Sequence, residues 1–237
     1  MKKTLLGALL STFAGSLLAS EADEVKAAAK KLGDNYSWRT TVAVPEGGGG
    51  GRFRPGPTEG KTDASGHILL AMTRGDNTTH AVLKGDKGAA KLEDEWRSLE
   101  ELSQDSGQPG PATFAARILR GYKAPAADVQ DLAGKTRELK KEGDMYAGDL
   151  TEEGAKTLLA FRGGRAGGGQ APTPTKASGS VKFWVKDGAL AKYEYKVAGT
   201  LNINGEDRDI ERTTTVEIKD VGKTKVEVPE EAKKKLS

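Results

Sequence analysis

The segment from Val181 to Val197 constrains the fold more than any other part of the sequence, because apolar and polar residues alternate along it. Every second residue on each side of Asp187-Gly188 is apolar: Val181, Phe183, Val185, Tyr193, Tyr195 and Val197. A period of two places these side chains on one face of a strand pair, and Asp-Gly is a favoured two-residue turn. The segment therefore predicts an antiparallel hairpin whose apolar face must be covered.

Further segments rich in β-branched and aromatic residues predict more strands. They are residues 36–44, 67–75, 79–85 and 89–92, a strand pair around Gly143-Asp144, the segment from Ile210 to Ile218, and residues 224–229. Tight turns separate several of these segments, which favours an antiparallel meander.

Short helices are predicted mainly in the middle of the chain, at residues 23–32, 94–102, 111–122 and 151–160, with one further turn at 128–132. Strands outnumber helices, and the two kinds of element do not alternate regularly. This order predicts an α+β fold: a strongly curved antiparallel sheet, shaped like a half-open β-barrel, with short mid-chain helices over its concave face.

The N-terminus reads as a secretory signal peptide. Lys2 and Lys3 precede an uncharged, largely apolar run from Thr4 to Leu18, and Ser20-Glu21-Ala22 offers small residues at the two positions that a signal peptidase reads. We expect cleavage after Ala22 and a periplasmic or secreted protein. The chain contains 0 cysteines, which excludes a cysteine-linked lipid anchor and any disulfide framework.

Length suits one domain, perhaps two, and charge gives no argument for a nucleic-acid partner. The 37 basic and 34 acidic residues give a net charge of +3, which supplies no overall attraction to nucleic acid. We expect residues 1–22 to be the signal peptide and residues 23–237 to form a single domain. Two glycine-rich stretches, at about 46–57 and 162–179, are expected to be flexible inserts.

The order of these elements resembles that of the LolA/LolB and LppX/LprG group of bacterial envelope proteins. "MYAGDLTEEGAKTLL" looks like the group's step from a strand to a short helix, "SGSVKFWVKDGALAKYEYKVAG" like its late hairpin, and "VEIKDVGKTKVEVPEEA" like its closing strand. The resemblance covers most of residues 24–232. It implies a half-open barrel closed by a helical lid, with acyl chains of a lipid or lipoprotein bound between them.

The candidate ligand-binding residues are apolar side chains of the late hairpin and of the helix at 111–122. They are Phe114, Ile118, Leu119, Phe183, Val185, Tyr193, Tyr195 and Val197. One interpretation is that they line an acyl-chain groove, which implies a lipid or acylated lipoprotein as partner and contact with a membrane surface. The other is that they pack directly on one another, in a structural or protein-binding envelope module with a filled core.

No pattern in the sequence predicts catalysis. Serine, histidine and aspartate are all present, but no G-x-S-x-G or comparable motif accompanies them. His67 and His80 fall at the ends of a predicted hairpin, without the spacing of a metal site. We expect a non-enzymatic protein with no cofactor and no metal, and the sequence leaves its oligomeric state open.

Overall fold

A computed structural model describes residues 20–45, 56–104, 110–160, 173–203 and 205–236. Its strands are β1 (Tyr36–Ala43), β2 (Thr58–Thr62), β3 (His67–Arg74), β4 (Asn77–Lys84), β5 (Lys87–Leu92), β6 (Glu95–Ser98), β7 (Lys140–Glu142), β8 (Met145–Asp149), β9 (Thr175–Lys186), β10 (Ala189–Ile203) and β11 (Glu206–Lys219). Its helices are α1 (Glu21–Lys30), α2 (Leu99–Gln104), α3 (Pro111–Gly121), α4 (Pro125–Gly134), α5 (Glu152–Leu159) and α6 (Glu230–Lys235).

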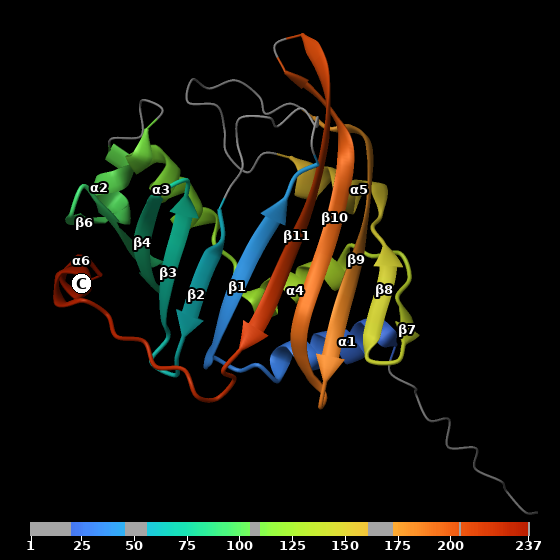
Figure 1. The fold of residues 1–237 in the computed structure, drawn as a ribbon, viewed down its shortest axis with the longest axis horizontal. Coiled ribbons are helices and arrows are strands. Elements are labelled where there is room, and N and C mark those ends of the chain that lie inside the picture. Colours follow the sequence, from blue (N-terminus) through green and yellow to red (C-terminus); the bar gives the residue numbers. More distant parts are fainter. Residues whose placement is uncertain (1–19, 46–55, 105–109, 161–172, 204, 237) are drawn as a thin grey trace, which may run out of the picture.

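All eleven strands form one antiparallel sheet in the order β6-β5-β4-β3-β2-β1-β11-β10-β9-β8-β7. Two meanders, β1 to β6 and β7 to β11, join where the first strand pairs with the last (Figure 1). The edge strands β6 and β7 do not pair with each other, so the sheet stays open. The predicted α+β class, a large antiparallel sheet with short helices, is confirmed.

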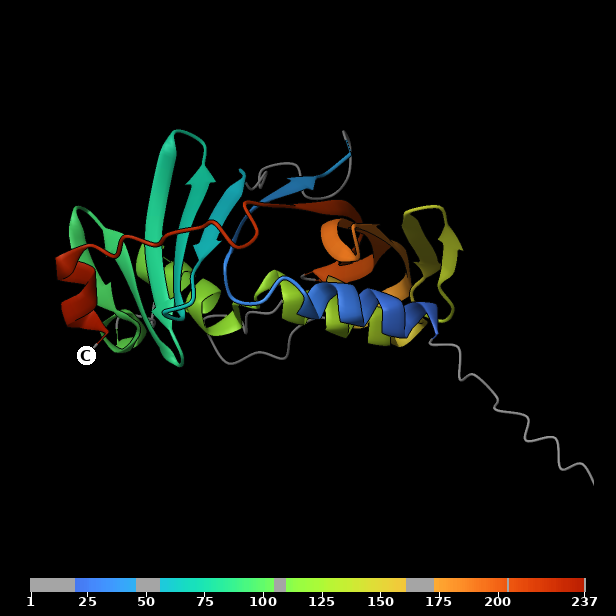
Figure 2. The same cartoon turned by 90° about the horizontal axis from the view of Figure 1, so that it is seen from below.

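The helices divide between the two halves of the sheet. Helices α1 and α5 contact β9 and β10, and α4 contacts α1, whereas α2 and α3 contact each other and β5. In Figure 2 the sheet arches over α1 and α4, which lie side by side beneath it. The inner face of the sheet is thus covered by two separate groups of helices. The link between α3 and α4 joins the two groups.

The late hairpin has the register that its alternation predicts. Tyr193 is opposite Phe183, and Tyr195 is opposite Val181, so the apolar residues share the inner face. Asp187 and Gly188 have φ angles of 53° and 73°. Such positive angles match a two-residue turn whose twist suits antiparallel strands.

Strand β2 was not predicted, because its sequence TEGKT contains a glycine and no aliphatic residue. Tertiary contact explains why the strand forms. The ring of Trp38 on β1 lies over Gly60, so close that a Cβ atom added at Gly60 would meet Trp38 Cζ2 at 2.0 Å. The glycine makes room for the indole, which is 5% exposed in the core.

Two predicted elements were wrong, and one predicted insert is shorter than expected. Residues 94–102 do not form one helix: β6 ends at Ser98 and α2 starts at Leu99. Residues 224–229 are not a strand, because their backbone N–H groups bond to side chains instead of a neighbouring strand. The second insert was predicted to extend to residue 179, but β9 starts at Thr175; residues 162–172 of that insert, and 46–55 of the first, lie outside the described residues.

The C-terminal segment runs along the end of the sheet to its opposite face. Thr224 N donates to Asn35 Oδ1 at 2.6 Å, and Val226 N donates to Asp63 Oδ2 at 3.0 Å. The segment ends in α6, which contacts β5 and β6 and forms a second small core on that face: Val82, Ala89, Trp96, Ala232 and Leu236.

An ion pair attaches α6 to α2, and we expect it to make stability depend on acid pH. Lys235 Nζ lies 2.6 Å from Glu101 Oε1, and this contact, with the Ser98 N–H, lowers the pKa of Glu101 from 4.5 to about 2. Because the folded-state pKa is depressed, the stabilisation is present above about pH 4.5 and is lost as the pH falls toward 2. Glu101→Gln should therefore melt at a lower temperature than the parent at pH 7.

The control for this prediction is Glu100→Gln, which removes an exposed carboxylate from the same helix. Melting curves recorded from pH 7 to pH 2 should converge for the parent and Glu101→Gln. A difference that stays constant down to pH 2 would contradict an electrostatic origin.

Helix α1 starts at Glu21, whereas cleavage was expected after Ala22. Ser20 is its N-cap, and its hydroxyl accepts a hydrogen bond from Asp23 N at 3.2 Å. A cut after Ala22 would fall within the first turn and remove this cap. In the parts of the chain that the structure describes, no helix is both long and apolar enough to cross a membrane.

Candidate functional site

The inner face of the late hairpin is closed over most of its length. Phe183 and Val197 are 0% exposed and Tyr193 is 2% exposed, beneath the helices that cover β9 and β10. Side chains that are fully enclosed by protein atoms do not line a water-sized space. This part of the predicted groove is therefore filled in the structure.

The structure brings some of the eight predicted groove residues together and separates others. The five hairpin residues share the inner face of β9 and β10, where Val185 and Tyr195 are half-buried. The three residues of α3 lie at the other half of the sheet, where Leu119 packs near Gly88 of β5. Ile118 and Phe114 are half-buried, and the guanidinium of Arg74 lies 5.6 Å from the centre of the Phe114 ring.

A cluster of tyrosines around one aspartate lies between these two parts. We call Tyr36, Tyr122, Tyr193 and Asp128 the tyrosine cluster. Its members come from β1, the residue after α3, β10 and α4, which are far apart in the sequence. Tyr36 and Asp128 act electrostatically on Tyr122, and Asp128 and Tyr122 act on Tyr193, so the four groups share one environment.

Hydrogen bonding in the cluster is uneven. The Tyr193 hydroxyl donates to Asp128 Oδ2 at 3.0 Å, and the Tyr36 hydroxyl is hydrogen-bonded to the backbone of Ala126. The Tyr122 hydroxyl is buried and has no hydrogen-bond partner among the described residues. A buried hydroxyl without a partner costs about 1–3 kcal/mol.

All three tyrosines remain protonated over the physiological pH range. Burial raises the pKa of Tyr36 to about 12 and raises the pKa values of Tyr122 and Tyr193 well above 10. The nearby carboxylate of Asp128 raises the latter two further. Each tyrosine therefore keeps its proton as a hydrogen-bond donor.

The position of Tyr122 follows from the junction of α3 and α4. Helix α3 ends at Gly121 and Pro125 starts α4, which leaves a short extended link, residues 122–124. The Tyr122 ring packs at 6.2 Å from that of Trp38, which itself lies 5.5 Å from the Tyr36 ring. The link thus packs Tyr122 against Trp38, which in turn contacts Tyr36.

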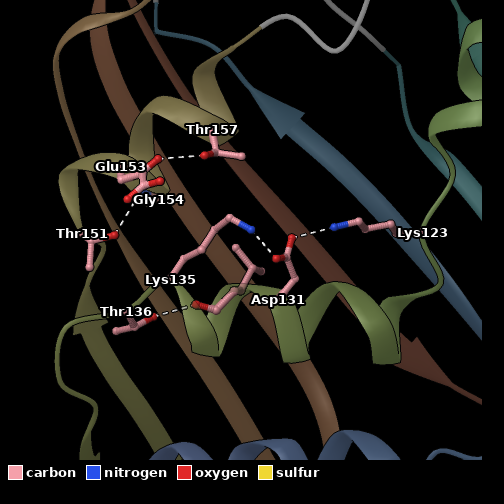
Figure 3. A network of polar contacts seen from close by, with 9 residues as sticks. Lys123, Asp131, Lys135, Thr136, Thr151, Glu153, Gly154 and Thr157 are labelled. Carbon is pink, nitrogen blue, oxygen red and sulfur yellow. Dashed lines mark hydrogen bonds and ion pairs between the residues drawn. The ribbon is translucent and has the colours of Figure 1, made fainter.

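An ion network holds the link against α4 (Figure 3). Lys123 Nζ lies 2.6 Å from Asp131 Oδ2, and Lys135 Nζ bonds to the other oxygen of the same carboxylate. Burial opposes ionisation of Asp131, but the hydrogen bonds from the two lysines outweigh it and lower its pKa. Asp131 is therefore charged, and it binds both lysine ammonium groups.

Helix α5 is fixed beside this network by its own cap. The Thr151 hydroxyl accepts a hydrogen bond from Gly154 N at 3.0 Å, and the Thr136 hydroxyl donates to the carbonyl of Leu132 (Figure 3). These bonds satisfy backbone groups at the start of α5 and the end of α4, which sets the two helices against the hairpin.

Comparison with solved structures finds chains that match this one. The structure is similar to that of a LolA superfamily protein from Nitrosomonas europaea. The two chains share 13% identity, the match covers 89% of this chain and 96% of that chain, and the TM-score is 0.36. The overlap is loose, so the fold class given above follows from this chain's own strands and helices. No protein-family model and no curated protein matches the sequence.

A second candidate is an open pocket of about 420 Å³ at the far end of β9, β10 and β11. Its lining residues are Pro45, Lys176, Ala198, Gly199, Thr200, Asp209, Ile210 and Glu211. Thr200 already donates to Asp209 at 2.7 Å, and Glu211 already pairs with Lys196. Because the carboxylates of Asp209 and Glu211 already have partners, the pocket makes a weaker case for a ligand than the tyrosine cluster does.

His67 contacts a serine and an aspartate, but the three side chains are not arranged as a catalytic triad. Ser65 Oγ lies 2.5 Å from Asp63 Oδ1 and 2.7 Å from His67 Nδ1, but the serine lies between the acid and the histidine in an exposed turn. In a catalytic triad the histidine takes that middle position. Among the described residues no group of three or more histidine and carboxylate side chains could hold a metal ion.

Sequence analysis missed the polar half of the cluster. Tyr122 entered only as the last residue of the helix predicted at 111–122, and Asp128 was given no role. The available signal was the sequence GYKAPAAD, in which a tyrosine lies between a helix-ending glycine and a helix-starting proline. That pattern marks a junction, but it does not reveal which strands the tyrosine meets.

Proposed function

We propose that the protein is a non-catalytic carrier or sensor that binds an acyl chain of a lipid or lipoprotein between the sheet and the α3–α4 junction. The observation that carries the proposal is the buried Tyr122 hydroxyl, which has no partner among the described residues. A donor kept at such a cost in free energy is best explained by a ligand that accepts its hydrogen bond.

The surroundings of Tyr122 suit the apolar part of such a ligand. Hydrophobic side chains of α3, the link, α4, β10 and β11 pack against the main core and remain only partly buried: Ile118, Tyr122, Ala126, Tyr195 and Ile218. An acyl chain that covered them would gain about 0.8 kcal/mol for each methylene removed from water. No covalent chemistry is needed for this partition.

The two-part helical cover supports entry at the junction. Helix α3 packs on α2 and β5, whereas α4 packs on α1, and the link at 122–124 connects the two helices. We propose that a small rotation at this link separates the two helices and exposes the site. The Lys123–Asp131 ion pair would hold the closed form.

The proposed location is the periplasm or the outside of the cell. This rests on the predicted signal peptide at residues 1–22, most of which lies outside the described residues. A carrier in that compartment would meet lipids and acylated proteins at membrane surfaces, where no cysteine-linked anchor would hold it.

Tyr195→Trp is expected to weaken ligand binding without unfolding the protein. Tyr195 is half-buried on the inner face, so a larger ring would occupy space that the ligand needs. We expect the dissociation constant of N-phenyl-1-naphthylamine, an uncharged fluorescent probe, to rise about tenfold. The free energy of unfolding should change by less than about 1.5 kcal/mol.

The matched control is Lys182→Trp, which adds the same ring to the exposed face of the neighbouring strand. It should leave probe binding unchanged. A Tyr195→Trp variant that mainly loses stability would show that Tyr195 lies in a filled core.

The alternative function is a structural or protein-binding envelope module. The full burial of Phe183, Tyr193 and Val197 favours it, because a filled core leaves no space for cargo. Mass spectrometry of lipid extracted from protein purified from its host separates the two. Stoichiometric lipid supports the carrier, whereas a clean extract and no binding of the naphthylamine probe support the module.

A further inference from the structure

We infer that the outer side of α3 is a docking surface for membranes that contain anionic phospholipids. This surface, the arginine patch, consists of Arg74 at the end of β3 and of Phe114, Arg117 and Arg120 on α3. The inference rests on the proposed function, because it names the side of the carrier that meets the membrane. Its test does not require a bound acyl ligand.

Two guanidinium groups lie near one aromatic ring in the patch. The guanidinium carbon of Arg74 is 5.6 Å from the centre of the Phe114 ring, and that of Arg117 is 5.9 Å from it. Phe114 is half-buried, whereas Arg74, Arg117 and Arg120 are exposed. The patch therefore presents an apolar ring beside exposed positive charges.

The positive charge of α3 is not balanced within its own segment. The 18 residues from Gly110 to Ala127 contain Arg117, Arg120 and Lys123 but no acidic residue, although 34 of the 237 residues of the chain are acidic. Arg117 and Arg120 form no ion pair with a described carboxylate, and Arg120 donates instead to the Ser103 hydroxyl. Both charges are thus available to an anionic partner.

One acidic residue adjoins the patch. Asp76 follows Arg74 by two residues, in the exposed turn between β3 and β4. Three arginines and one aspartate still leave a net charge of +2 on this side of the molecule. The patch therefore attracts anions even when the whole turn is counted with it.

The patch lies next to the proposed entry for the ligand. The opposite side of α3 is buried through Ala115, Ala116 and Leu119, so the patch side faces away from the core. In Figure 1 α3 lies beside the end of β3, and the chain continues from it to α4 at the centre of the molecule. A membrane that contacted the patch would adjoin the link at 122–124.

A membrane fits this combination of side chains better than an acidic protein does. A protein interface of standard size has an apolar centre, whereas α3 offers one half-buried ring. Arginine binds phosphate groups well, and an aromatic ring can enter the boundary between headgroups and acyl chains. Each arginine near an anionic membrane strengthens binding about fivefold, an effect that salt screens.

The test is co-sedimentation of the protein, purified from its host, with vesicles of two compositions. One is pure phosphatidylcholine, and the other contains about 25% phosphatidylglycerol, which supplies the negative surface charge. We expect about tenfold stronger binding to the anionic vesicles at low ionic strength. Sodium chloride at about 0.5 M should abolish this difference.

Two variants assign the binding to the patch. Arg117→Glu replaces an exposed positive charge with a negative one and should weaken binding to the anionic vesicles about tenfold. Phe114→Ala should weaken it about threefold and leave its salt dependence unchanged, because only apolar contact is lost. Thermal melting checks that both variants are folded.

The matched control is Lys61→Glu, which changes the net charge by the same amount at an exposed residue of β2. Lys61 is opposite Leu69, which packs on the second small core at the other face of the sheet. All variants share the same N-terminal segment, so a difference between them cannot come from it. Lys61→Glu should bind the anionic vesicles as the parent does.

The outcomes separate the docking surface from the carrier. Equal weakening by Arg117→Glu and Lys61→Glu would overturn the patch, because binding would then follow net charge alone. Absence of binding to anionic vesicles would overturn it in favour of an acidic protein partner, and binding of the naphthylamine probe would still support the carrier. Vesicle binding by a folded protein that does not bind the probe would overturn the carrier and support the docking surface.

Discussion

Phe183→Ala is expected to lower the free energy of unfolding by about 4 kcal/mol, the largest effect of any single substitution proposed for this chain. Phe183 is 0% exposed in the centre of β9, opposite Tyr146 on one side and Tyr193 on the other. Truncation removes a whole ring and leaves a cavity between two bulky neighbours, which the antiparallel strands cannot close by a small shift. Urea unfolding followed by far-UV circular dichroism measures the loss.

The control is Trp184→Ala, which removes a larger ring from the next residue. Trp184 faces the opposite side of the sheet, where it is half-buried and the ammonium of Lys192 lies 4.6 Å from the ring centre. We expect it to cost about 1 kcal/mol. The ratio of the two effects tests which face of the hairpin is buried.

The Phe183 result also bears on function. Phe183 was predicted to line the ligand groove, yet the structure encloses it. If Phe183→Ala cost less than about 1 kcal/mol, the side chain would line an empty or exchangeable space, and the groove would extend along the whole hairpin. A large loss would confine the proposed ligand to the α3–α4 junction.

Gly60→Ala is expected to cost about 3 kcal/mol and to disturb the centre of the sheet. The added methyl group would meet Trp38 Cζ2 at 2.0 Å and Cε2 at 2.1 Å, distances that force the indole to move. The indole is held by Tyr36 and Tyr122, so its displacement would also move the tyrosine cluster. Near-UV circular dichroism and urea unfolding report the two effects.

Gly121→Ala is the matched control for this substitution. Nothing lies within 4 Å of the position that its Cβ would occupy, and alanine is a better helix former than glycine at the end of α3. We expect it to be neutral or slightly stabilising. A Gly60→Ala variant as stable as the parent would show that Trp38 is free to move, contrary to its 5% exposure.

The strands could be predicted from the sequence to the extent that their pattern is local. The alternation on both sides of Asp187-Gly188 and the hairpin of β3 and β4 were predicted nearly to the residue. Strand β2 could not be predicted, because TEGKT has no apolar alternation and depends on Trp38, which is more than twenty residues earlier. The strand at 224–229 was predicted from its valines, but Asn35 and Asp63 take its backbone N–H groups.

The candidate site, like the strands, could be predicted from the sequence only in part. The apolar residues of the hairpin and of α3 were named from their periodicity, and the structure places all but Phe114 in the core or packed against it. Phe114 instead contacts the guanidinium of Arg74. Their grouping was not predictable, because periodicity gives the face of an element and not the neighbour that covers it. In the structure α3 covers β5, whereas α1 and α5 contact the hairpin.

The sequence by itself determined that the chain forms an antiparallel sheet with one apolar face and short helices to cover it. The alternation of side chains and the turn residues are local features of a few positions, so they can be recognised in the sequence. Only the tertiary structure decided that β1 pairs with β11, that Trp38 lies over Gly60 and beside Tyr122, and that Tyr193 bonds to Asp128. Those contacts join residues that are from twenty to nearly two hundred positions apart in the sequence. They stabilise the protein only once the sheet and its helices have come together.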